Sequence, residues 1–241
     1  MFNRQRWVEQ QALNYFQADF SNDTLRGFLI KARLVLWQIS NRAYAVIKRG
    51  KDIIFSFSLL LILSPVFLVV ALLIRLESPG SVLFSQTRIG LYGKPFRFWK
   101  FRSMCFDAEQ TKHQLTDKAQ SNGIRFKLKT DPRITRVGRV IRKYSIDELP
   151  QLWNVLIGDM SLVGPRPALP CEVDAYDLAD KQRLCVLPGI TCIWQVSGRA
   201  DIPFKEQVSL DVKYQLSQSF WQDIKLLLLT IPAVILGKGA Y

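Results

Sequence analysis

Two adjacent carboxylates, Asp147 and Glu148, lie in a part of the sequence that is otherwise rich in arginine and lysine. Residues 125–143, just before them, carry eight basic side chains and a single acid, Asp131. An ionised carboxylate in such surroundings can act as a nucleophile or bind a magnesium ion, and its neighbour can complete the metal shell or move a proton. The pair is therefore the first candidate for catalysis, and nearby guanidinium groups are candidates for binding a diphosphate.

A helix cap is the alternative explanation for the pair, because Ser145 and Glu148 have the spacing of a capping box. Pro150 argues against that register, since it would fall at the fifth helical position, where a backbone amide is needed. A helix that starts at Asp147 instead places Pro150 in the first turn, where its missing N–H costs little. In that register the helix dipole and the neighbouring arginines are predicted to keep Asp147 ionised.

The composition limits the class of protein. The chain has 241 residues, 49% of them hydrophobic, and a formal charge of +13, so its partner is expected to be nucleic acid, an anionic membrane surface or a phosphorylated substrate. A single histidine and four cysteines without a C-x-x-C pair argue against a zinc site, and the thiols are expected to be reduced. The first twenty residues contain no secretory signal, which predicts that most of the chain stays on the cytosolic side.

Residues 53–74 form an uncharged apolar stretch that indicates a membrane segment. As a helix it would be about 33 Å long, enough to cross a hydrocarbon core about 30 Å thick. Ser64 and Pro65 interrupt it at the middle, and proline removes a backbone donor from a helix. Composition leaves a kinked spanning helix and a re-entrant helix-break-helix open, and the basic residues at both ends favour re-entry because such residues prefer the cytoplasmic side.

Other segments predict the elements that surround the dyad. Residues 24–49 have the periodicity of an amphipathic helix that lies on the membrane or packs on a partner chain. Apolar and polar residues alternate on both sides of GLYGKP, residues 90–95, which predicts a β-hairpin. Residues 107–123 are polar and predict an exposed insertion in which His113 is solvated. The apolar stretch 226–236 is too short to span, which favours a helix in the membrane interface or over the core.

The motifs around the dyad resemble the bacterial sugar transferases, the monotopic phosphoglycosyl transferases that begin polyprenyl-linked glycan assembly. Residues 131–167, which end in VGPRP, carry this resemblance together with FWKFRSM at 98–104 and PGITCIWQVSGR at 188–199, and it covers residues 48–241. It implies an α+β, mainly helical fold, in which a small β-hairpin and interfacial amphipathic helices surround a cytosolic catalytic domain. The expected domains are an N-terminal extension at 1–47, a re-entrant membrane helix at 48–75 broken at Ser64 and Pro65, and the catalytic domain at 76–241.

The resemblance also implies a reaction. A sugar 1-phosphate passes from a UDP-sugar to undecaprenyl phosphate with release of UMP, through a covalent intermediate on Asp147, while Glu148 supports it by magnesium binding or proton handling. The expected cofactor is Mg²⁺, with Asp147 and Glu148 as its ligands. The substrate-binding residues that the motifs imply are Lys100, Arg102, Arg142, Pro165, Arg166, Pro167, Gln195 and Arg199.

The implied setting is the bacterial inner (cytoplasmic) membrane, with a monotopic chain, a catalytic domain facing the cytoplasm and anionic phospholipids as partners. The product would be the first intermediate of exopolysaccharide, capsule or O-antigen synthesis. The sequence does not identify the sugar or the oligomeric state, and a homodimer is one of the states that it allows. Two other classes compete. A non-catalytic scaffold of a glycan-assembly complex would be favoured by an altered dyad, and the dyad is intact. A basic membrane-associated nucleic-acid-binding protein would not explain the apolar segment, and no helix-turn-helix or RNA-binding signature is present, so no nucleic acid is expected.

Overall fold

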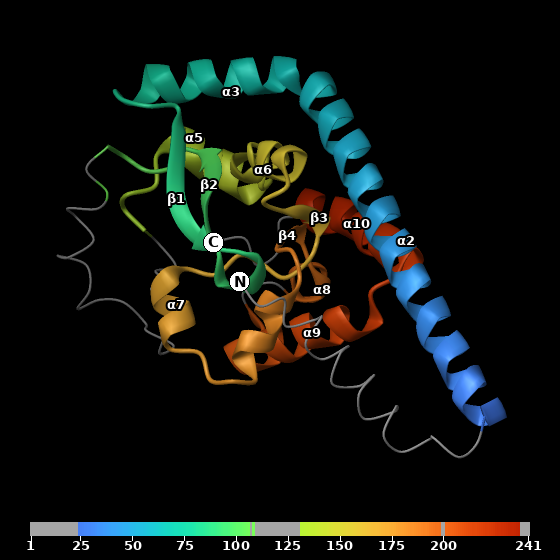
Figure 1. Cartoon of the computed structure of the whole chain (residues 1–241). Coiled ribbons are helices and arrows are strands. Elements are labelled where there is room, and N and C mark those ends of the chain that lie inside the picture. The colour runs from blue at the N-terminus through green and yellow to red at the C-terminus, as the bar shows by residue number, and fades with distance from the viewer. Residues whose placement is uncertain (1–23, 107, 109–130, 199–200, 237–241) are drawn as a thin grey trace. The chain divides into compact units, whose positions relative to one another are not determined.

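The computed structural model describes residues 24–106, 108, 131–198 and 201–236 (Figure 1). The chain divides into two compact units, Met1–Lys48 and Arg49–Tyr241. The dyad and its surroundings belong to the second unit, which is described from here on. It is mainly helical with two small sheets, as the α+β prediction requires.

Two consecutive helices meet at the predicted break. Helix α2 spans Thr24–Ile62 and helix α3 spans Ser64–Glu77, and the bend between Arg42–Ile62 and Ser64–Glu77 is 59°. Pro65 occupies the first turn of α3, where its missing N–H costs little, and Ser64 Oγ donates to the carbonyl of Leu61 over 2.8 Å. Within the described ranges, no single helix is long and apolar enough to cross a membrane, whereas this bent pair passes that test by length and composition. The helix-break-helix is therefore present, and its place in a membrane stays a prediction.

The predicted hairpin is confirmed. Strand β1, Leu83–Ile89, pairs antiparallel with β2, Pro95–Phe101, and the turn between them contains the short 3-10 helix η1, Leu91–Gly93. Phe84 faces Lys100 across the ladder, and Arg88 faces Phe96. A second sheet was not predicted: β3, Ser161–Val163, pairs parallel with β4, Gly189–Thr191.

Short helices connect these strands. In chain order they are α5, Arg136–Lys143; the 3-10 turn η3, Ile146–Glu148; α6, Gln151–Ile157; α7, Pro170–Asp174; the 3-10 helix η4, Asp180–Cys185; α8, Ile193–Ser197; α9, Phe204–Ser217; and α10, Phe220–Leu236. The last of these contains the apolar stretch that was expected to lie in the membrane interface or cover the core. Leu226 in it is buried in the core, while Leu228 and Ile231 are exposed.

Two hydrophobic clusters share strand β2. Phe98 packs in a cluster that joins β2 to α6, β3, α9 and α10, and Phe101 packs in a second one with α3 and α5. Strand β2 is thus fixed on both sides of Lys100, which lies between these two phenylalanines in the sequence. Hydrophobic burial of this kind is the main force that keeps the hairpin against the helices.

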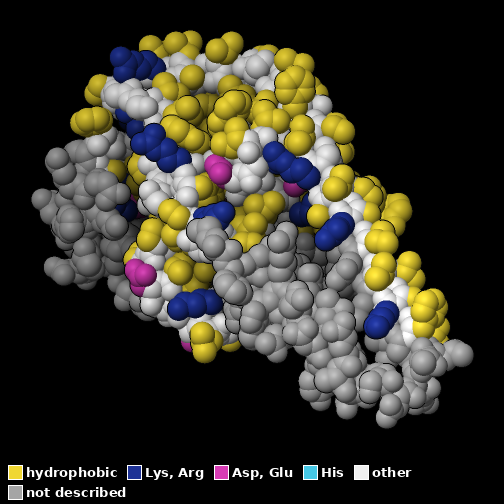
Figure 2. All heavy atoms as spheres, viewed as in Figure 1, with side chains coloured by type: hydrophobic (Ala, Val, Ile, Leu, Met, Phe, Trp, Pro, Cys, Tyr) yellow, Lys and Arg dark blue, Asp and Glu magenta, His cyan; other side chains and the backbone are white. Residues whose placement is uncertain are grey.

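Apolar side chains are also exposed along α3 and along the part of α2 that belongs to the second unit (Figure 2). Among residues 49–77, the apolar side chains with the largest accessible fractions are Ile54, Leu61, Ile62, Leu68 and Leu76. Neighbouring exposed apolar side chains of this kind mark an interaction site.

Candidate active site

Helix α5 leads to the dyad, and contacts at its first turn fix its position. Thr135 Oγ1 accepts from the N–H of Gly138, and the Glu77 carboxylate accepts from the N–H groups of Arg136 and Val137 over 2.7 and 2.9 Å. These acceptors satisfy the free amides of the first turn of α5, so the end of α3 is tied to the helix that leads to Asp147.

The chain turns sharply between α5 and the dyad. Ser145 has a left-handed backbone (φ 53°), a conformation that non-glycine residues rarely adopt, and η3 then presents Asp147 and Glu148. The side chain of Ser145 makes no cap, so the pair is not a capping box. The helix that was expected to start at Asp147 starts at Gln151 with Pro150 as its N-cap, because a separate 3-10 turn accommodates the dyad.

The two acids have different environments. Arg166 Nη1 donates to Glu148 Oε1 over 3.0 Å; burial raises the pKa of Glu148, but the charge and hydrogen bond of Arg166 outweigh it, so that pKa lies below its usual value. Asp147 is 7% exposed, and burial together with the charge of Glu148 raises its pKa to about 7. The prediction that its surroundings keep Asp147 ionised is therefore wrong: the nearby cations act in that direction but are outweighed. Two carboxyl groups whose pKa values are pushed apart in this way are typical of a catalytic pair.

Three of the predicted cations act on the dyad. Lys100, Arg142 and Arg166 each favour ionised Asp147, and burial, with the charges of the two arginines, lowers the pKa of Lys100 to about 8. The Lys100 ammonium also lies 5.2 Å from the centre of the Phe84 ring. The structure thus brings together, from β2, α5 and the Pro-Arg-Pro motif, the charges that a phosphorylated substrate needs.

Arg88 is a further cation of this site that the sequence reasoning missed. Its Nη1 donates to the carbonyl of Pro167 over 3.1 Å, its guanidinium lies 5.2 Å from the centre of the Phe98 ring, and its charge lowers the pKa of Glu148. The alternation within the predicted hairpin contained the signal, because Arg88 and Lys100 share one face of the β-ladder.

Strand β3 delivers the Pro-Arg-Pro motif to the dyad. The Gly164 N–H donates to the carbonyl of Thr191 over 3.0 Å, and the Gly189 N–H donates to that of Pro165 over 2.8 Å. The backbones approach so closely that a Cβ at either glycine would collide with the other strand. Pro165 and Pro167 are buried, so we assign them to shaping the loop, while Arg166 reaches Glu148.

The remaining predicted residues have other surroundings. The guanidinium of Arg102 donates to the carbonyls of Ser78 and Pro79 over 2.7 and 2.6 Å, so it secures the connection between α3 and β1, and its contacts do not support substrate binding. Gln195 Oε1 accepts from the Cys192 thiol over 3.0 Å. Arg199 lies outside the described residues, as do His113 and the rest of segment 109–123.

Magnesium fits the donor set of the dyad. Proteins hold Mg²⁺ through one or two carboxylates, and substrate phosphates and waters complete its octahedral shell. Asp147 and Glu148 supply two such groups, and their mutual repulsion is what a divalent cation would relieve. The described ranges contain no group of three or more His, Cys, Asp or Glu residues that could hold a metal. Two carboxylates are nevertheless within the number that a magnesium site uses.

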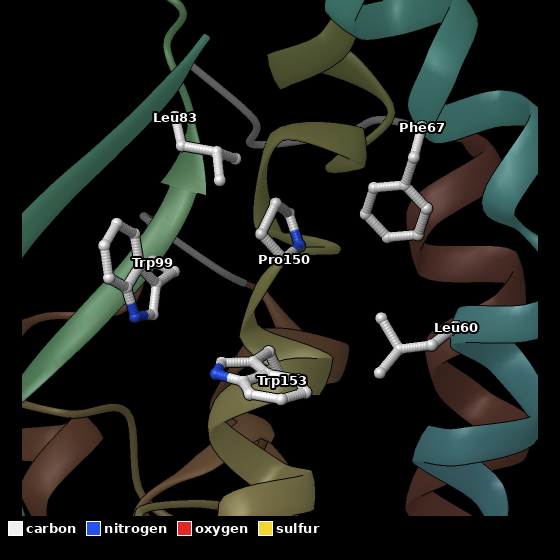
Figure 3. A pocket seen from close by; sticks show the side chains of 6 residues that line it. All are labelled: Leu60, Phe67, Leu83, Trp99, Pro150 and Trp153. Carbon is white, nitrogen blue, oxygen red and sulfur yellow. The ribbon is translucent and has the colours of Figure 1, made fainter. Parts of the chain in front are cut away.

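An apolar pocket of about 360 Å³ lies between the bent helix pair, the hairpin and α6 (Figure 3). Its lining residues are Leu60, Phe67, Leu83, Trp99, Pro150 and Trp153. Trp99 and Lys100 are neighbours in β2, so their side chains point to opposite faces of the hairpin. The pocket suits a hydrocarbon group rather than a nucleotide, and strand β2 separates it from Lys100.

Comparison with known proteins identifies the family. Residues 43–237 match the family model of the bacterial sugar transferases. The chain belongs to the bacterial sugar transferase family. A galactosyl transferase, CpsE, of Streptococcus agalactiae is 50% identical over 199 residues, which are 82% of this chain and 44% of the relative. The exopolysaccharide production protein ExoY of Sinorhizobium fredii is 39% identical over 201 residues, 80% of this chain and 88% of the relative.

A third relative within the bacterial sugar transferase family carries the name of a complete reaction. The UDP-glucose:undecaprenyl-phosphate glucose-1-phosphate transferase of Escherichia coli is 39% identical over 208 residues, 81% of this chain and 42% of the relative. The chain thus spans about half the length of the streptococcal and E. coli relatives.

Proposed function

We propose that this chain transfers a sugar 1-phosphate from a UDP-sugar to undecaprenyl phosphate, giving undecaprenyl-diphosphate-sugar and UMP, as the first membrane step of exopolysaccharide, capsule or O-antigen synthesis. The observation that carries the proposal is Asp147, a buried carboxyl beside an Arg166–Glu148 ion pair and the Lys100 ammonium. The name of the E. coli relative supports the donor and the acceptor, since it states both.

In the first step, a carboxylate oxygen of Asp147 attacks the phosphorus that bears the sugar. A bond forms between this oxygen and phosphorus, and the bond to the bridging oxygen of the diphosphate breaks, so that UMP leaves with the electron pair. Lys100, Arg142 and Arg166 bind the phosphate oxygens and offset the negative charge that collects on them in the transition state. Asp147 must be ionised to attack, and its pKa of about 7 leaves a large fraction in that form at neutral pH.

In the second step, an oxygen of undecaprenyl phosphate attacks the same phosphorus. The new diphosphate bond forms as the acyl-phosphate bond breaks, and Asp147 returns as a carboxylate. Splitting the reaction means that the water-soluble donor and the lipid acceptor need not occupy the site together. Arg166 holds Glu148 ionised and orients it beside Asp147 in both steps.

Asp147 and Glu148 are the residues that would hold Mg²⁺ in this site. When bound, the ion supplies Lewis-acid charge that offsets the phosphate oxygens.

We further propose that the bent pair α2 and α3 enters and leaves the bacterial inner membrane on one face, which keeps the site at the cytoplasmic surface. The exposed apolar residues of both helices and the basic residues at each end support this arrangement. A cysteine placed before Ile53 and another after Arg75, in a background without native cysteines, should react with an impermeant thiol reagent from the same side. Labelling from opposite sides would show that the pair crosses the membrane.

The reaction is tested by incubating the purified chain in lipid nanodiscs with UDP-sugars, Mg²⁺ and undecaprenyl phosphate while UMP is measured. Wild type should release UMP with at least one donor, and the Asp147→Asn variant should not. A phosphosugar adduct on Asp147, detected by mass spectrometry when the acceptor is omitted, would identify the nucleophile. If wild type releases no more UMP than the variant with any donor tested, the proposal fails. The donor panel includes glucose, galactose and their N-acetylated forms, because the named relatives use different sugars.

A further inference from the structure

A buried ion pair lies behind the Pro-Arg-Pro motif. Arg183 of η4 and Asp211 of α9 are 2.5 Å apart, and each side chain is 1% exposed. The guanidinium also donates to the hydroxyl of Tyr176 over 3.1 Å and lies over the ring of that tyrosine. Its second terminal nitrogen reaches the backbone carbonyl of Arg166 at 3.4 Å. The pair therefore connects two helices to the residue that holds Glu148.

The motif depends on such outside contacts because its prolines have no N–H to donate. Its loop is held through its carbonyl groups, and four successive ones accept hydrogen bonds from four different donors. These are Pro165 from the Gly189 N–H, Arg166 from Arg183, Pro167 from Arg88, and Ala168 from the Ile89 N–H. Three of the donors are placed by the two small sheets, and Arg183 is placed by Asp211 and Tyr176.

Stability alone gives little reason for an ion pair at this depth. Two well-packed apolar side chains of similar volume are often as stabilising as a buried ion pair, because removing both charges from water is costly. A planar guanidinium, however, can hold a carboxylate, a hydroxyl and a carbonyl at fixed directions at once, which an apolar side chain cannot do. The contacts of Arg183 use this geometry.

We propose that Arg183 is a positioning residue: paired with Asp211, it fixes the backbone of Arg166 and so keeps the Arg166 side chain on Glu148. The effect on catalysis rests on the proposed function, whereas the effect on the loop does not. A shift of about 1 Å in a charged group of an active site can cost up to roughly 100-fold in rate, so loosening Arg166 has a measurable consequence.

The test compares two double variants that each remove a buried ion pair without leaving an unpaired charge. Arg183→Met with Asp211→Leu removes the proposed anchor. Lys51→Met with Asp223→Leu is the matched control, since that pair is 2.6 Å apart, its side chains are 5% and 0% exposed, and a tyrosine hydroxyl also bonds its acid. Both are studied as the full chain in lipid nanodiscs, and Arg183→Lys serves as a milder variant that keeps a cation opposite Asp211.

The first measurement is amide hydrogen exchange, which needs no substrate. The amides of Gly189 and Ile89, which donate to the loop carbonyls of Pro165 and Ala168, should exchange at least tenfold faster than in wild type when the Arg183 pair is removed, and should change less than twofold in the control. Arg183→Lys should give a smaller acceleration, because an ammonium lacks the planar fork. Equal exchange at these two amides in both double variants would overturn the proposal.

The second measurement is UMP release per folded molecule. Loss of the Arg183 pair should lower kcat by about 10- to 100-fold, with the KM for the donor changed by less than about threefold. In an Arg166→Ala background the same loss should cost less than about twofold, since the two residues act through one contact. If removing the Arg183 pair lowers kcat by the same factor in the Arg166→Ala background as in wild type, the role of Arg183 in catalysis is wrong. If wild type releases no UMP while the exchange result holds, the proposed function fails and the anchoring of the loop stands.

Discussion

Replacing Asp147 by asparagine should abolish transfer and yet stabilise the fold at neutral and alkaline pH. Burial and the charge of Glu148 raise the pKa of Asp147 from 3.8 to about 7. One pKa unit corresponds to about 1.4 kcal/mol, so ionising this buried side chain in the folded protein costs up to about 4 kcal/mol above pH 7. Asparagine has nearly the same shape and never pays this electrostatic cost, because it does not ionise.

The sign follows from proton binding. Between pH 3.8 and about 7 the folded protein keeps a proton on Asp147 that the unfolded chain has lost, so the stability of wild type falls as the pH rises through this window and is constant above it. The variant lacks this loss. The free energy of unfolding of the variant, relative to that of wild type, should therefore be about 2 kcal/mol larger at pH 8.5 than at pH 5.5. This difference corresponds to a shift on the order of 4–8 °C in Tm for a chain of this size.

The assay is thermal unfolding in lipid nanodiscs with EDTA at both pH values. Asp223→Asn is the control, since it breaks the buried pair with Lys51 and should destabilise by about 3–5 kcal/mol at either pH. Adding Mg²⁺ at pH 8.5 should raise the Tm of wild type and leave that of the Asp147→Asn variant nearly unchanged. An Asp147→Asn variant that melts below wild type at pH 8.5, or whose advantage is the same at both pH values, would refute the reasoning.

Three further predictions concern the residues around the dyad. Because the pKa of Lys100 is about 8, kcat/KM for UMP release should decline as the pH rises through about 8. The Lys100→Met variant should be at least about tenfold slower and lack this decline. If the variant shows the same decline at alkaline pH as wild type, the assignment to Lys100 is wrong. Arg102→Ala should lower the Tm while the KM for the donor stays within twofold of wild type, since its partners are backbone carbonyls; a large rise in KM would restore its predicted substrate role. Asn154→Ala should lower the free energy of unfolding by roughly 3 kcal/mol in thermal melts, because a fully buried amide that bonds the backbone of Arg97 and Trp99 is lost. A loss under about 1 kcal/mol would argue against these hydrogen bonds.

Local sequence patterns predicted the elements whose causes are local. Alternation in residues 83–101 predicts the hairpin and also which face Lys100 shares with Arg88. The proline after Ser64 predicts the helix break, and Pro150 correctly argues against a capping box at Ser145. In each case, the covalent geometry of proline or the two-residue period of a strand fixes the outcome without help from the rest of the chain.

Features that depend on distant contacts were not predicted. Strands β3 and β4 have three residues each and are separated by 25 residues, so no local period marks them. The pKa of Asp147 depends on burial by elements far along the chain, which the count of nearby arginines does not report. The arginines of the basic segment 125–143 also have different roles. Arg133 forms an ion pair with Asp131 before helix α5 begins, whereas the charge of Arg142 acts on the dyad. A regular spacing of charges therefore did not indicate which of them serve the site.

The contact between Gly164 and Gly189 has a consequence for engineering the sugar preference of this chain. A mutant library that varies both the donor site and these two positions would lose most of its members for a reason unrelated to sugars, since any side chain there separates the two strands that carry Arg166 to the dyad. Such members would be scored as inactive on every donor and would give false information about specificity. Libraries that keep both glycines fixed and vary exposed positions near Lys100 would report on recognition alone.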